Sequence, residues 1–106
     1  MVKIVLEHRT KSPENTQILV ELIKQVRAVA RKQPGFITGE TLVDAEDPCH
    51  AVVISTWKRV EDWEAWDKSP ERMATRPVIE ALLVVPFNAM ILSTPVVWRE
   101  DIAHEF

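Results

Sequence analysis

One segment, residues 12–35, contains the signals of a complete amphipathic helix. Ser12-Pro13-Glu14 supplies an N-cap, a proline for the first helical position and an acid near the positive end of the helix dipole. Pro34-Gly35 ends the helix, because proline cannot continue it and glycine tolerates the reversal of the chain. Between these signals, apolar residues recur at helical spacing through about Lys32: Ile18, Leu19, Leu22, Ile23, Val26, Val29 and Ala30.

Strand patterns lie on both sides of this helix. Residues 2–9 alternate, which predicts a strand with Ile4, Leu6 and His8 on one face. After the helix, residues 36–43 and 50–57 have the composition of two further strands. The polar residues between them, Asp44 to Pro48, are typical of a turn, so we expect a β-hairpin.

The second half of the chain is predicted to be helical and then extended. A helix is expected from about Arg59, with two acids near its positive end. Ser69-Pro70 and Arg76-Pro77 predict two breaks, because the residue before a proline resists the helical conformation. The apolar stretch 84–98 predicts a fourth strand, interrupted or bulged near Pro95.

The predicted order is therefore β-α-β-β-α-β. Its usual solution is the ferredoxin-like α+β fold, in which helices cover one face of a four-stranded antiparallel sheet. A single domain over residues 1–106 fits the chain length. The third and fourth strands are apolar on both faces, and the helices cover only one of them. We therefore expect a homodimer in which two sheets pack together.

Composition excludes several classes of partner. The net charge of -3 and the scattered basic residues argue against nucleic acid. No apolar run approaches the roughly 18 residues of a membrane span, and the N-terminus does not resemble a signal peptide. The single Cys49 cannot form an internal disulfide, which favours a cytoplasmic location. Cys49-His50 matches no zinc-ligand spacing, so we expect no metal.

Three tryptophans, Trp57, Trp63 and Trp66, fall within ten residues. They predict either an aromatic core or one wall of a flat apolar pocket. Trp57 and Trp63 are assigned mainly to the core. Trp66 has two interpretations: a core residue that pins the second helix to the sheet, or a ring that stacks on a planar ligand and donates its indole N–H.

The tryptophan segment also carries a family resemblance. Trp57-x3-Glu61-Asp62-Trp63-x2-Trp66-x2-Ser69-Pro70, together with Pro34-Gly35-Phe36 and the element order, resembles the antibiotic biosynthesis monooxygenase (ABM) domain. That resemblance implies a dimeric α/β barrel with a pocket between sheet and helices. The family includes oxygenases that act on polycyclic quinols without a cofactor, haem-degrading enzymes and proteins of unknown activity. The quinol-oxidising members commonly use a pocket tyrosine, and this chain has none.

The haem-degrading branch can be compared residue by residue. Its strand asparagine, pocket tryptophan and axial histidine fall on His8, Trp66 and Arg76 of this chain. Arginine is always protonated and offers no lone pair to iron, so it cannot replace the axial imidazole. Haem degradation is therefore the least favoured of the activities that the resemblance implies, unless His8 ligates the iron from the opposite wall of the pocket.

The resemblance favours a cofactor-independent monooxygenase or related oxidoreductase acting on a small aromatic or quinol-like molecule. In that interpretation Trp66 positions the ring, His8 is the base, and Arg76 binds an anionic group or oxyanion, with Arg72 able to share this task. The alternative is a non-catalytic binding or structural dimer. There the tryptophans and His8 are core residues, and Arg76 is an ordinary surface arginine.

Overall fold

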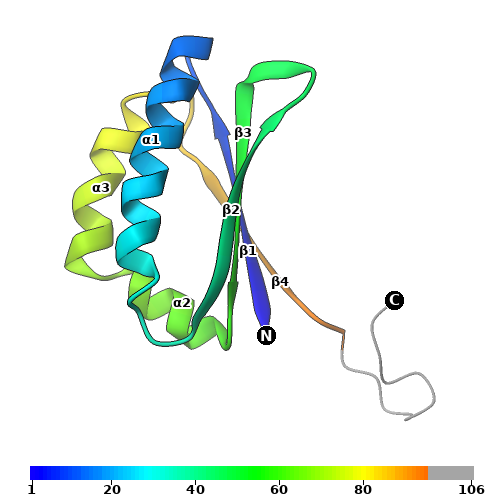
Figure 1. Cartoon of the computed structure of the whole chain (residues 1–106), viewed down its shortest axis with the longest axis vertical. Coiled ribbons are helices and arrows are strands. Elements are labelled where there is room, and N and C mark those ends of the chain that lie inside the picture. The colour runs from blue at the N-terminus through cyan, green and yellow to red at the C-terminus, as the bar shows by residue number, and fades with distance from the viewer. Residues whose placement is uncertain (96–106) are drawn as a thin grey trace.

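Four antiparallel strands form one sheet in the order β2-β3-β1-β4. The computed structural model describes residues 1–95. Its strands are β1 (Val2–Arg9), β2 (Phe36–Asp44), β3 (Asp47–Trp57) and β4 (Asn88–Ser93). Its helices are α1 (Pro13–Ala30), α2 (Val60–Asp67) and α3 (Pro70–Glu80), and all lie on one side of the sheet (Figure 1). The ferredoxin-like fold is confirmed, and the second helical region of the predicted order consists of two helices, α2 and α3.

The first helix forms as its sequence signals predict. The Ser12 side chain accepts a hydrogen bond from the Asn15 backbone N–H at 3.1 Å, and Pro13 occupies the first turn. After α1 ends at Ala30, Gly35 reverses the chain with a φ of 84°, a conformation that favours glycine. A Cβ at this position would also collide with the Asp62 carboxylate. Gly35 therefore fixes both the entry into β2 and the approach of α2.

The two prolines of the second helical region behave differently. Ser69-Pro70 is a break, as predicted: the Ser69 hydroxyl caps α3 by accepting from the Arg72 backbone N–H at 3.2 Å. The predicted break at Arg76-Pro77 is wrong, because Pro77 lies inside α3. A proline there removes one backbone hydrogen bond. Ile79, two residues later, is only 1% exposed, and its burial holds the helix in place beyond the proline.

Strand boundaries differ most at the last strand. The hairpin of β2 and β3 is confirmed, with β3 beginning at Asp47 rather than at the predicted residue 50. The last strand is shorter than the predicted 84–98: β4 spans Asn88–Ser93, and residues 96–98 lie outside the described part of the chain. Leu83 and Val84 instead bond to the end of β1, through a bridge to Thr10 and a hydrogen bond to the Arg9 carbonyl.

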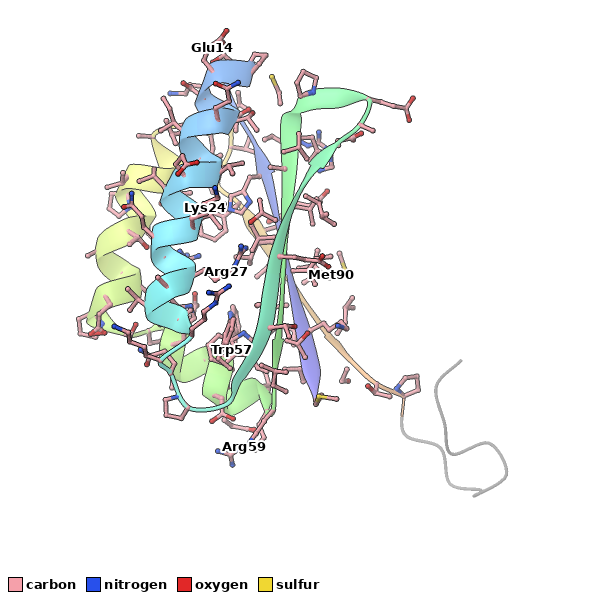
Figure 2. The ribbon with its side chains drawn as sticks, viewed as in Figure 1. Glu14, Lys24, Arg27, Trp57, Arg59 and Met90 are labelled. Carbon is pink, nitrogen blue, oxygen red and sulfur yellow. The ribbon has the colours of Figure 1, made fainter. Side chains whose placement is uncertain are left out.

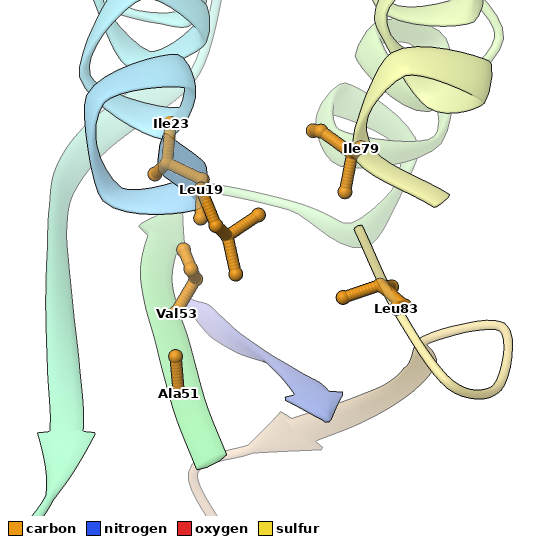
Figure 3. Close-up of a cluster of buried hydrophobic side chains, with 6 residues drawn as sticks. All are labelled: Leu19, Ile23, Ala51, Val53, Ile79 and Leu83. Carbon is orange, nitrogen blue, oxygen red and sulfur yellow. The ribbon is translucent and has the colours of Figure 1, made fainter. Parts of the chain in front are cut away.

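The core lies between the sheet and the helices, in two clusters of buried side chains. One cluster joins α1 and α3 to β3 (Figure 3): Leu19, Ile23, Ala51, Val53, Ile79 and Leu83. The other joins β1 and β3 to α1 and α2: Ile4, Ala30, Trp57 and Trp66. Each large side chain buried here contributes about 1.5–3 kcal/mol. None of the three helices in residues 1–95 combines the length and apolar character needed to cross a membrane.

The opposite face of the sheet carries a second set of apolar side chains. Val5 of β1 pairs with Ile54 of β3 and with Met90 of β4, which places the three side chains side by side on this outer face. Leu42 and Leu92 lie on the same face and are 49% and 46% exposed. Met90 points away from the helices (Figure 2). The predicted two-sided apolar character is therefore confirmed, and no helix in residues 1–95 covers the outer face (Figure 1).

Candidate functional site

A cavity lies under the helices, between the two core clusters. Its volume is about 60 Å³, and together with the open solvent space that adjoins it the total is about 530 Å³. A cavity of 60 Å³ holds a few water molecules, whereas ligand pockets usually measure roughly 300 Å³ or more. A ligand would therefore have to use the mouth as well. The polar and aromatic residues of the lining are His8, Arg27, Phe36, Ser55, Trp57, Trp63, Trp66 and Arg72.

All three tryptophans of the sequence motif line this cavity. Trp57 is fully buried, its ring lies edge-on to Phe36 at 5.2 Å between centroids, and its indole N–H donates to the Ser55 hydroxyl at 3.0 Å. Trp66 is also buried, at 6% exposure. The cluster is thus both core and cavity wall, and the indole N–H is the donor that Trp66 could offer to a ligand.

His8 lies on the helix-facing side of β1, as predicted, and lines the cavity. Only 1% of the residue is exposed, and its Nδ1 has no hydrogen-bond partner within the described residues. Burial, followed by the charge of Arg72, lowers the pKa of His8 from 6.5 to about 4, while an interaction with the Ala51 backbone acts in the opposite direction. The imidazole is therefore neutral at pH 7 and can accept a proton at a buried nitrogen.

Arg72 is the buried cation of the site. It is 5% exposed and lies with its guanidinium 5.5 Å from the centre of the Phe87 ring. Its side chain donates one hydrogen bond, from Nη1 to the Thr75 hydroxyl at 3.3 Å. Burial, and then the charge of Arg76, lower the pKa of Arg72, whereas Asp67 raises it. A buried charge is costly unless something compensates it.

Arg76, the cation chosen from the sequence, does not line the cavity. Its guanidinium pairs with the Asp67 carboxylate and covers the Phe87 ring at 5.2 Å. The structure thus brings His8 and Trp66 together around one cavity and places Arg72, not Arg76, beside them. Arg72 is four residues earlier on the same side of α3, which explains why the sequence pattern alone does not separate the two.

Arg27 is a cavity residue that the sequence analysis did not identify. It projects from α1, and its Nη2 donates to the Thr41 hydroxyl of β2 at 2.6 Å. In the sequence it follows Ile23 at a spacing of four residues, which places it beside the apolar stripe of the helix. This position on the helix is the sequence signal that could have identified Arg27 as a cavity residue. A basic residue at the edge of a buried apolar stripe reaches either solvent or an internal polar site.

Two other kinds of site, a metal site and a haem site, were also considered for residues 1–95. No group of three or more His, Cys, Asp or Glu side chains in residues 1–95 is arranged to hold a metal ion. The position of the axial histidine does not fit haem either, because Arg76 lies outside the cavity and has no lone pair for iron.

The fold and the cavity define an α+β domain with a partly enclosed polar site between its sheet and its helices. The family model described as antibiotic biosynthesis monooxygenase matches residues 1–77. That match covers well over half of the chain, and the chain therefore belongs to the antibiotic biosynthesis monooxygenase family. No curated protein matches the chain significantly.

Solved structures share the fold at low sequence identity. An antibiotic biosynthesis monooxygenase matches with a TM-score of 0.78 at 20% identity, over 90% of this chain and 99% of its own. SnoaB, a cofactor-independent oxygenase from Streptomyces nogalater, matches with a TM-score of 0.76 at 16% identity, over 93% and 97%. Rv0793 from Mycobacterium tuberculosis matches with a TM-score of 0.77 at 16% identity, over 89% and 94%. At such identities the similarity establishes the fold alone.

Proposed function

We propose that this protein is a cofactor-independent monooxygenase that oxidises a small aromatic, quinol-like molecule in the cavity. The observation that carries the proposal is the buried Nδ1 of His8, which has no partner in residues 1–95 and lies in the same cavity as Trp66 and Arg72. Membership of the monooxygenase family supports it, as does the shared fold with SnoaB. A purely structural core would bury a polar atom such as His8 Nδ1 together with a hydrogen-bond partner.

Each residue has a distinct role in the proposed reaction. His8 Nδ1 accepts the proton of the substrate hydroxyl, and the resulting anion gives electrons to dioxygen more readily than the neutral phenol does. Trp66 packs against the ring and donates its N–H to an oxygen of the substrate. Arg72 stabilises the oxyanion, the role that the sequence gave reason to assign to Arg76. Arg76 is proposed instead as a positioning residue that, with Phe87, holds Arg72 in place.

The low pKa of His8 is compatible with this role because it depends partly on Arg72. In the free protein, a base with a pKa of about 4 is weak. An oxyanion forming beside Arg72 offsets the positive charge that disfavours the imidazolium. Proton transfer and oxyanion binding therefore support each other at the same place in the cavity.

Oxygen uptake with a panel of hydroquinones and naphthohydroquinones tests the proposal. The variant His8→Gln removes the base, and we expect its turnover to fall by about 10²–10⁴-fold. His50→Gln is a matched control, because His50 lies on the outer face of the sheet and does not line the cavity. Full turnover in His8→Gln would overturn the role of His8. Tight binding of the quinols with no oxygen uptake above buffer would instead favour the non-catalytic binding protein.

We further propose that the protein acts as a homodimer joined through the outer face of the sheet. The support is the row of Val5, Ile54 and Met90 across three strands, which leaves Met90 50% exposed in the single chain. Contiguous apolar surfaces of this kind mark association sites. Sedimentation at micromolar concentration should give twice the 12.2 kDa of one chain, and a species of one chain mass would contradict the dimer.

A further inference from the structure

Two guanidinium groups line the cavity, one from α1 and one from α3. The ion pairs formed within residues 1–95 involve neither Arg27 nor Arg72. Arg72 is buried and Arg27 is partly buried, so both positive charges are at least partly withdrawn from water. Holding such charges without a carboxylate partner costs free energy that an anionic ligand would recover.

The place of Arg27 is shaped by its neighbours. Its guanidinium reaches from α1 towards β2 (Figure 2), where Thr41 accepts its hydrogen bond. A Cβ on Gly39 would lie 2.9 Å from Arg27 Nε, so the absence of a side chain there gives the guanidinium its space. Gly39 has no positive φ, and space rather than backbone conformation is therefore its contribution. Burial, followed by the charge of Arg31, lowers the pKa of Arg27, whereas Glu40 raises it.

The two cations stand over different strands. Arg27 is held by Thr41 on β2, whereas Arg72 shares the Phe87 ring with His8 of β1. Strand β3 lies between β2 and β1. Because neighbouring strands are about 4.8 Å apart, the two anchoring points are separated by roughly 10 Å across the sheet. One small anion such as a single carboxylate does not span that distance, but a fused aromatic system with a group at each end does.

We propose that the substrate is a planar hydroxyaryl carboxylic acid, whose carboxylate binds Arg27 while its reacting hydroxyl lies between His8 and Arg72. This inference rests on the proposed function for the position of the hydroxyl, and it adds a second, permanently charged group at the far end of the ring system. The carboxylate accepts charge-assisted hydrogen bonds from Arg27. Arg27 thereby determines specificity and orientation, and it takes no part in the proton transfer.

Binding without turnover tests the inference separately from the reaction. Calorimetric titration under anaerobic conditions would compare 6-hydroxy-2-naphthoate with its methyl ester, which keeps the ring and hydroxyl and lacks the charge. We expect the wild-type protein to bind the acid at least about tenfold more tightly than the ester. In Arg27→Gln the affinity for the acid should fall to that for the ester, while the affinity for the ester is unchanged.

Two further variants separate a specific contact from a general loss of charge. Arg31→Gln removes the same charge four residues further along the chain, at the C-cap of α1 and outside the cavity, and it should keep the preference for the acid. Gly39→Ala keeps every charge but displaces Arg27, and it should weaken the preference. Thermal unfolding of each variant would confirm that it is folded.

Three results would overturn the inference. They are equal affinities of the wild-type protein for acid and ester, equal losses in Arg27→Gln and Arg31→Gln, and no binding of either probe at millimolar concentration. The titration measures affinity, and the hydroquinone panel measures oxygen uptake. A preference for the acid, with no oxygen uptake from the panel, would overturn the proposed function and leave the role of Arg27 standing. Oxygen uptake from the panel, with no preference for the acid, would overturn the role of Arg27 and leave the proposed function standing.

Discussion

The two faces of the sheet each hold one histidine, and the two histidines differ in almost every respect. His8 pairs with Ala51 and His50 pairs with Arg9, so they occupy consecutive positions of the β1–β3 ladder on opposite faces. Burial first, and Arg72 second, lower the pKa of His8 to about 4. His50 lies between Asp44 and Glu7, at 3.0 Å and 2.9 Å, and these hydrogen bonds raise its pKa, that with Asp44 most.

The contrast extends from the histidines to the whole of each face. The helix-covered face buries its apolar groups well, but within residues 1–95 it leaves His8 Nδ1 without a hydrogen-bond partner and the Arg72 guanidinium without an ion pair. The outer face does the opposite: its histidine is hydrogen-bonded on both sides, while Leu42 and Met90 are exposed. Buried polar atoms without hydrogen-bond partners indicate a binding site, and exposed apolar side chains indicate an association surface. On the proposals made above, one sheet thus separates the reaction from the association of subunits.

Glutamate substitutions at two adjacent positions of β3 give the largest expected effect. Ala51 is fully buried in the helix-facing core, so Ala51→Glu would place an unpaired carboxylate there and cost several kcal/mol, enough to unfold a domain of ordinary stability. Val52 lies on the outer face, where Val52→Glu should leave the subunit folded and dissociate the proposed dimer. Far-UV circular dichroism and sedimentation measure the two outcomes.

Either of two results for Val52→Glu would break the comparison. If the variant remains a dimer at micromolar concentration, the outer face is not the interface between subunits. If it unfolds like Ala51→Glu, the outer face belongs to the folding core, and the division between a chemical face and an assembly face fails. A folded monomer would sharpen the comparison, because it would show that the helix-covered core is sufficient for folding.

An intermediate effect is expected from the pH dependence of stability. The unfolded chain takes up a proton on His8 near pH 6.5, whereas the folded chain does so only near pH 4. The contribution of His8 to stability is therefore fully present above about pH 6.5 and is lost as the pH falls towards 4, by about 3 kcal/mol in all. His8→Gln should remove this contribution, so that its free energy of unfolding falls less between pH 7 and pH 4.

Urea unfolding at the two pH values measures this difference. The carboxylates of the chain also affect acid stability, but they are common to both proteins, so the comparison isolates His8. The same loss of free energy in the wild-type protein and in His8→Gln would show that His8 is not buried as a neutral group. That result would also remove the base from the proposed reaction.

Local periodicity accounts for what the sequence could predict. The order of elements and the faces of His8 and Trp66 follow from alternation in strands and from the spacing of apolar residues in helices, which depend on neighbours within a few positions. The outer apolar face follows from the same alternation, because Val52 and Met90 are apolar on strands whose other face is apolar too. These features could be predicted because no distant contact decides them.

The choice between Arg72 and Arg76 depends on contacts that local patterns do not contain. Both lie on one side of α3, and only the packing of Phe87 and Asp67 directs Arg76 away from the cavity. Arg27 was missed because its place depends on Gly39, which follows it by twelve residues and belongs to another element. The break expected at Pro77 failed for a similar reason, since the buried Ile79 beyond it decides the path of the helix.

The smallest expected effect concerns His50 and tests whether the histidine contrast arises from the side chains that surround each ring. Asp44 is the largest cause of the raised pKa of His50, so Asp44→Asn should lower that pKa towards 6.5 and leave His8 unchanged. Proton NMR titration measures the pKa of both rings, with His50→Gln to assign the resonance.

Because the folded pKa of His50 is raised, its contribution to stability is present below pH 6.5 and is lost as the pH rises through the folded value. Asp44→Asn should therefore weaken the protein more at pH 6 than at pH 8. An unchanged titration of His50 in this variant would mean that the hydrogen bond with Asp44 does not persist in solution, and the outer face would then be less ordered than the cavity side.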